Sequence, residues 1–127
     1  MRLIHSSDLQ IGMVFNYFDS DAATRLQDAR QGLGELSGPF DMAFLDGVKM
    51  QYGDYFDAVL PLLGSGSVLV VDNVLRSGRV AVGRGDESVS DEQIAYARQF
   101  NQRLLTHPEL VGTITPVGDG LLLAVKR

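Results

Sequence analysis

Two aspartates stand directly after two strongly apolar segments of the chain. The run MAFL is followed by Asp46, and the run SVLVV is followed by Asp72 and then Asn73. In an open parallel sheet the carboxyl ends of the strands line one crevice, so acids that leave neighbouring strands converge. Carboxylate and amide oxygens are the ligands that Mg²⁺ prefers. The sequence therefore predicts a metal site made of Asp46, Asp72 and Asn73, with Lys49 beside it.

Each of these acids alone also has a structural explanation, because an Asp at the end of a strand is commonly a loop or helix-cap residue. Their combination with an adjacent Asn and a nearby Lys favours a site. Tyr52 and Tyr55 are interpreted as packing groups on a helix rather than as substrate contacts. His107, before Pro108, is interpreted as a helix-end residue because nothing nearby supplies a second metal ligand.

Composition limits the classes of function that remain. The 127 residues are 45% apolar and 21% charged, which suits one soluble globular domain over 1–127, and no apolar run approaches the roughly 20 residues of a membrane span. A net charge of −5 argues against a nucleic-acid partner. The absence of cysteine excludes disulfides and, with no secretion signal at the start, leads us to expect a cytoplasmic protein.

Hydrophobic periodicity predicts alternating strands and helices in the first half of the chain. Amphipathic spacing of three and four residues behind Ser20 indicates a helix. A wholly apolar, β-branched run is typical of a central strand covered on both faces. The elements expected are a strand at 2–5, a helix at 21–36, a strand at 40–45, a helix from about 56 to 63 that ends at Gly64-Ser65-Gly66, and a strand at 67–71.

The second half begins with a loop over 76–89 that contains three arginines and lies where a substrate lid would sit. Ser90-Asp91-Glu92-Gln93 has the spacing of a capping box, so a helix is expected to begin at 91. Two strands at 111–116 and 121–125 flank Asp119-Gly120, which reads as the tight turn of an antiparallel hairpin.

The resulting order βαβαβαββ predicts a three-layer α/β/α sandwich, a truncated Rossmann-like fold with a mostly parallel sheet and a C-terminal antiparallel hairpin. Right-handed crossovers give the strand order 1-2-3-5-4. An exposed sheet edge could also support a homodimer.

Residues 38–127 resemble the C-terminal part of the cation-dependent O-methyltransferases of the catechol and caffeoyl-CoA type. The family's motifs are a strand ending in Asp with Lys three residues later, then a strand ending in Asp-Asn, and a tail like PVGDG; these fall on Asp46 with Lys49, on Asp72-Asn73 and at 116–120. The resemblance implies a Rossmann-like fold and transfer of a methyl group from S-adenosylmethionine to one hydroxyl of a vicinal diol.

The resemblance also implies roles for single residues. Mg²⁺ or another divalent cation would be bound by Asp46, Asp72 and Asn73, and Lys49 would be the catalytic residue that accepts or steers the hydroxyl proton. Asp46 would also belong to the cofactor-binding set, and Asp28 would echo the acid that lies near the adenine. The glycine-rich cofactor turn of the family is missing from the 37 upstream residues.

The opening MRLIHSSDLQIG is similar to the first strand and metal-binding turn of calcineurin-like metallophosphoesterases. Asp8 matches that family's first ligand, but Gln10 stands where its histidine belongs, and its later motifs are absent. One hypothesis is therefore a hybrid chain, in which an atypical opening over 1–37 replaces the nucleotide-binding half of a methyltransferase.

Two functions follow from these expectations. In the first, the chain is a metal-dependent O-methyltransferase that acts on a small molecule and uses S-adenosylmethionine. In the second, it is a non-catalytic truncated or chimeric α/β module that keeps the fold and a metal site but has no cofactor pocket.

Overall fold

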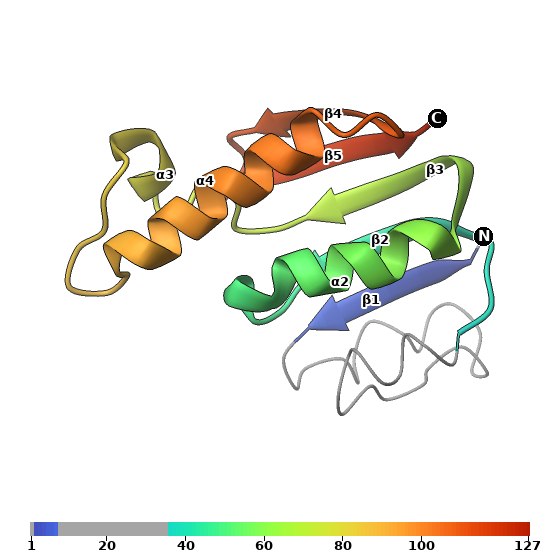
Figure 1. Ribbon diagram of the computed structural model, residues 1–127, viewed down its shortest axis with the longest axis horizontal. Coiled ribbons are helices and arrows are strands. Elements are labelled where there is room, and N and C mark those ends of the chain that lie inside the picture. The colour runs from blue at the N-terminus through green and yellow to red at the C-terminus, as the bar shows by residue number, and fades with distance from the viewer. Residues whose placement is uncertain (1, 8–35) are drawn as a thin grey trace.

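The structure is a computed structural model that describes residues 2–7 and 36–127. Its described part is built on a five-stranded sheet with the order β1-β2-β3-β5-β4 (Figure 1). The strands are β1 (Leu3–Ser7), β2 (Phe40–Asp46), β3 (Leu63–Val71), β4 (Leu110–Thr115) and β5 (Leu121–Lys126). The order 1-2-3-5-4 expected from the sequence is confirmed.

The sheet is parallel on one side and antiparallel on the other. Strand β2 pairs in parallel with β1 and with β3, whereas β5 runs antiparallel to both β3 and β4. The predicted C-terminal hairpin is therefore confirmed. Because β1, β2 and β3 run the same way, their carboxyl ends lie at one edge of the sheet.

The two longer helices of the described part are α2 (Tyr52–Val59) and α4 (Asp91–Leu105). Both lie in front of the sheet in Figure 1, so they cover the same face. The helix expected at 21–36, which would form the third layer, lies outside the described residues except for Leu36, which is not helical. No helix of the described residues has the length and apolar character that a membrane span needs.

Helix α4 begins where the sequence predicts it. The Ser90 side chain accepts a hydrogen bond from the Gln93 backbone N–H at 3.2 Å, and the Ser90 N–H donates to Gln93 Oε1 at 2.9 Å. This reciprocal pair satisfies two backbone donors that the first turn would otherwise leave unbonded. The predicted capping box is thus confirmed.

Three local expectations differ from the structure. The second helix ends earlier than predicted, because Pro61 lies in a 3₁₀ turn, η3 (Leu60–Leu62), that leads directly into β3. Strand β3 includes Gly64-Ser65-Gly66, which we expected to end the helix. The loop predicted at 76–89 contains one helical turn, α3 (Arg79–Val82).

The core lies between the helices and the sheet. Its largest fully buried side chains come from both layers: Phe56, Ile94 and Leu104 from helices, and Leu45, Leu69 and Leu122 from strands. Each buried side chain of this size contributes roughly 1.5–3 kcal/mol relative to an exposed one. This packing fixes the helices on the face of the sheet whose edge carries the predicted site residues.

Candidate functional site

The carboxyl ends of β2 and β3 bring the two predicted acids to neighbouring positions. Leu45 and Val71 are register partners, and each is followed by one of the aspartates. The pairing continues one step further, because the Asp72 N–H donates to the Leu45 carbonyl at 3.0 Å. Asp46 and Asp72 therefore leave adjacent parallel strands at the same edge.

Lys49 lies beside Asp46. It opens the 3₁₀ turn η2 (Lys49–Gln51) that follows β2, and its Nζ lies 2.8 Å from Asp46 Oδ1. The Lys49 ammonium also lies 5.2 Å from the centre of the Tyr52 ring, a cation–π distance. Burial opposes its charged form, but the interactions with Asp46 and Tyr52 outweigh burial and raise the pKa of Lys49 above its ordinary value. Lys49 therefore brings a positive charge to this edge.

Asn73 has an unusual backbone conformation. Its φ of 58° lies in the left-handed region, which Asn tolerates better than most residues. Its N–H donates to Asp72 Oδ1 at 2.6 Å. The chain therefore turns sharply at the residue that the sequence predicts to supply the amide oxygen.

Two side chains that sequence reasoning did not assign to the site contact this turn. Tyr52 Oη donates to the Asp72 carbonyl at 3.1 Å, and Asn101 Nδ2 donates to the Val74 carbonyl at 2.8 Å. Burial raises the pKa of Tyr52 above its usual range, although the Lys49 ammonium opposes this. The one available signal was Asn101 itself, a polar residue on the apolar stripe of its helix.

The GDG segment of the tail supports the same turn from the other side. The Gly120 and Asp119 carbonyls accept hydrogen bonds from the Val74 and Leu75 N–H groups at 3.1 and 3.0 Å, and Asp119 Oδ1 accepts one from the Ser77 N–H. Gly120 has a φ of 86°, and a Cβ there would lie 2.8 Å from Leu75 Cδ1. Glycine is therefore required for this close approach.

A small pocket opens between this edge and α4. Its lining combines polar ends with aromatic rings: Lys49, Tyr52, Asn73, Val74, Arg76, Tyr96, Ala97, Phe100 and Asn101. The predicted site residues Lys49 and Asn73 thus share one concave surface with the two side chains that contact the turn.

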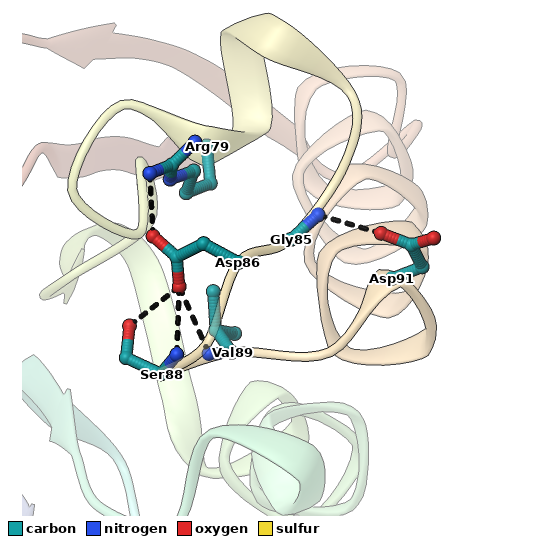
Figure 2. Close-up of polar contacts among 6 residues, drawn as sticks. All are labelled: Arg79, Gly85, Asp86, Ser88, Val89 and Asp91. Atoms are coloured by element: carbon teal, nitrogen blue, oxygen red, sulfur yellow. Dashed lines mark hydrogen bonds and ion pairs between the residues drawn. The ribbon is translucent and has the colours of Figure 1, made fainter.

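The loop after α3 is held by Asp86 (Figure 2). Its Oδ2 lies 2.5 Å from the Arg79 guanidinium, and its Oδ1 accepts hydrogen bonds from the Ser88 hydroxyl and from the Ser88 and Val89 N–H groups. The Ser88 hydrogen bonds, with Arg79 adding a smaller contribution, lower the pKa of Asp86 to about 2. Arg79, one of the three loop arginines, therefore has an internal partner.

The donor set at the sheet edge suits a hard divalent cation. Among the side chains that the structure describes, no three of His, Cys, Asp or Glu are grouped to hold a metal ion, so a cation here would depend on two carboxylates and the Asn73 amide. Asp46 and Asp72 each use Oδ1 in a hydrogen bond, and no described residue donates to either Oδ2. Oxygen donors of this kind fit Mg²⁺, with positions left for water or substrate. Asp8 and Asp28 lie outside the described residues.

Comparison with known proteins places these features in a family context. The family model described as O-methyltransferase matches residues 10–127. The chain is 38% identical over 98 residues to a catechol O-methyltransferase from Niastella koreensis. The aligned region covers 73% of this chain and 42% of that relative. The chain thus spans less than half the length of this relative.

Solved structures agree with the family match. The O-methyltransferase TomG from Streptomyces achromogenes, in complex with SAM, has a TM-score of 0.61 and 31% identity over 80% of this chain and 47% of its own. The SAH-bound methyltransferase PaMTH1 from Podospora anserina has a TM-score of 0.71 over 98% of this chain and 60% of its own, at 19% identity, and supports the fold alone.

These matches change the interpretation of the opening. The family match begins at residue 10 and so includes most of the segment 1–37 that we interpreted as atypical. The comparisons give no support to a metallophosphoesterase segment or to a hybrid chain.

Proposed function

Since the chain belongs to the O-methyltransferase family, we propose that it serves in the transfer of a methyl group from S-adenosylmethionine to a hydroxyl of a catechol-like small molecule. We further propose that Asp46, Asp72 and Asn73 hold a divalent cation such as Mg²⁺ for this reaction. The named relatives, among them a catechol O-methyltransferase and a methyltransferase in complex with SAM, support this assignment.

One observation carries the proposal of a metal site. Asp46 and Asp72 follow register partners on parallel strands, and the Asp72 N–H is bonded to the residue before Asp46. This arrangement gives two neighbouring carboxylates at the edge where parallel sheets place their ligands. If the two aspartates followed apolar segments only by chance, the residues before them would not need to be register partners.

A divalent cation at this edge would lower the pKa of a bound hydroxyl and hold both oxygens of a vicinal diol. When bound, S-adenosylmethionine would supply the methyl group: the methyl–sulfur bond would break as the bond to the acceptor oxygen forms, and the proton of the acceptor hydroxyl would pass to water. The task of Lys49 is to steer the acceptor hydroxyl electrostatically, because its ammonium lies beside Asp46. Asp46 is also proposed to contact the cofactor, as is Asp28, which the structure does not describe.

A cytoplasmic location, a small-molecule partner without nucleic acid, and a homodimer remain predictions. So does the second function, a module without catalysis. The chain corresponds to 42% and 45% of the lengths of two curated relatives.

Isothermal titration with S-adenosylmethionine and with Mg²⁺ tests the two functions against each other. Micromolar cofactor binding supports the methyltransferase, whereas metal binding without cofactor binding supports the module. The same titrations on Asp46→Asn and Asp72→Asn show whether any metal heat arises at the proposed ligands. Unchanged metal binding in either variant would refute the proposed site.

A further inference from the structure

We propose that Tyr52 and Asn101 are positioning residues that hold Asn73 in the orientation needed to bind a cation. The inference rests on the proposed metal site, in which Asn73 supplies the amide oxygen. Neither side chain has to touch the cation. Their action is on the backbone that carries the ligand, and they reach it from two different helices, α2 and α4.

The contact from α2 fixes the peptide that precedes Asn73. Tyr52 Oη donates to the Asp72 carbonyl at 3.1 Å. The Tyr52 ring is itself held, because it is 4% exposed and its centroid lies 5.5 Å from that of Phe100 on α4. A hydroxyl on a buried and packed ring has little freedom to move, so the carbonyl it bonds is fixed relative to the core.

The contact from α4 fixes the chain just beyond Asn73. Asn101 is 5% exposed, and its Nδ2 donates to the Val74 carbonyl at 2.8 Å. The side-chain amide cannot be reversed, because Oδ1 would then face the carbonyl oxygen and repel it. Carbonyl groups on both sides of Asn73 are therefore bonded to buried side chains of separate helices.

The two contacts stabilise an unfavourable backbone conformation at Asn73. A φ of 58° is unfavourable for a residue with a Cβ and persists where the surroundings fix it. This conformation decides the direction in which the Asn73 side chain leaves the backbone. Holding the peptide before Asn73 and the carbonyl of Val74 after it therefore also holds the proposed metal ligand.

A buried amide at position 101 lowers the stability of the fold unless its hydrogen bond to the Val74 carbonyl compensates. Asn101 Oδ1 is the buried side-chain oxygen that has no hydrogen-bond partner among the described residues. A buried acceptor without a partner destabilises a protein, and an apolar residue such as Leu would avoid that cost on the apolar stripe of α4. The bond from Nδ2 to Val74 is the gain that opposes this cost. The same Asn101 lines the pocket shared by Lys49 and Asn73.

Three conservative variants test the inference. Tyr52→Phe removes the hydroxyl and keeps the ring, and Asn101→Leu removes the amide at similar volume. Ser67→Ala is the matched control, because buried Ser67 Oγ also donates to a strand carbonyl, that of Phe40 at 2.6 Å, but at the amino-terminal end of β2, away from the edge that carries Asn73. Mn²⁺ affinity is measured by titration of each folded variant, and urea denaturation is measured in parallel.

We expect Tyr52→Phe and Asn101→Leu each to weaken Mn²⁺ binding by about 10-fold, as loss of a supporting contact commonly does. We expect Ser67→Ala to lose stability with unchanged Mn²⁺ affinity. If both test variants fold and bind Mn²⁺ like the wild type, or if all three variants weaken it equally, the inference is wrong.

A second readout separates this inference from the proposed function. The backbone φ of Asn73 is followed by NMR coupling constants without any metal. If the wild type does not bind Mn²⁺, the metal site fails, and the positioning role is then decided by NMR alone. Loss of the left-handed φ in the two test variants but not in Ser67→Ala supports the role, and its retention overturns it.

Discussion

Lys49 Nζ and Asp46 Oδ1 lie 2.8 Å apart, three residues from each other across the turn between β2 and η2. The pair joins Lys49, which is proposed to steer the acceptor hydroxyl, to Asp46, which is a proposed metal ligand. Both side chains are partly exposed, at 25% and 37%, so solvent weakens their attraction and stability is not its main consequence. The main consequence of the ion pair is that an incoming cation meets the positive charge of Lys49 beside Asp46.

Replacing Lys49 with Met is expected to tighten the binding of a divalent cation. The change removes a positive charge beside Asp46 and keeps a side chain of similar length. Affinity should rise by roughly 10-fold, which is about 1.4 kcal/mol. This lies between the about 1 kcal/mol in water and about 4 kcal/mol near a protein surface for two unit charges about 4 Å apart. Titration with Mg²⁺ measures it. Weaker binding in Lys49→Met would mean that Lys49 shapes the site rather than opposing the cation.

The Asp86 carboxyl is expected to titrate far below an ordinary aspartate. Its folded-state pKa of about 2 lies below the unfolded value, so the stability it contributes is present above about pH 4 and is lost as the pH falls through about 2. Its side-chain carbon resonance should follow this midpoint in an NMR titration. Asp86→Asn should remove this dependence from the acid unfolding curve, whereas a midpoint near 4 would contradict the hydrogen bonds drawn in Figure 2.

Gly120→Ala is expected to destabilise the turn that supports Asn73. The positive φ alone costs about 1–3 kcal/mol for a residue with a Cβ, and the close approach to Leu75 adds to it. Gly66→Ala is the control, because Gly66 has a similar φ of 83° but nothing within 4 Å of its would-be Cβ. Urea denaturation should therefore show a larger loss for Gly120→Ala. Equal losses of unfolding free energy in the two variants would show that the close approach to Leu75 does not affect stability.

Ser90→Ala is expected to cost about 1 kcal/mol of stability. The change removes the oxygen that accepts the Gln93 N–H and leaves that backbone donor without its cap. The exposed Ser65→Ala in β3 serves as a comparison, since no side-chain hydrogen bond of Ser65 is found within the described part of the chain. A cost for Ser90→Ala no larger than that of Ser65→Ala would count against the capping box.

Patterns with strong local causes allowed much of the fold to be predicted. The strand order follows from parallel crossovers and a terminal hairpin, and the start of α4 follows from the spacing of Ser90 and Gln93. Asp46 and Asp72 were placed at one edge because strand ends converge in a parallel sheet. These features depend on neighbours in sequence or on general rules of chain topology.

Features that depend on distant partners could not be predicted in the same way. Gly64-Ser65-Gly66 looks like a helix stop, yet it lies in the strand β3 that pairs with β2. Tyr52 was expected only to pack. Its hydrogen bond could not be predicted, because it joins residues that lie 20 positions apart in the sequence. The Asn101 bond spans 27 positions, and it appears only when α4 docks against the Asn73 turn.

The central claim is that Asp46 and Asp72 share one cation, and an electron paramagnetic resonance titration with Mn²⁺ tests it most directly. The account predicts one Mn²⁺ per chain in the wild type and in the exposed control Glu92→Gln, with binding weakened at least about 10-fold in Asp46→Asn and in Asp72→Asn. Wild-type affinity in either aspartate variant would contradict it.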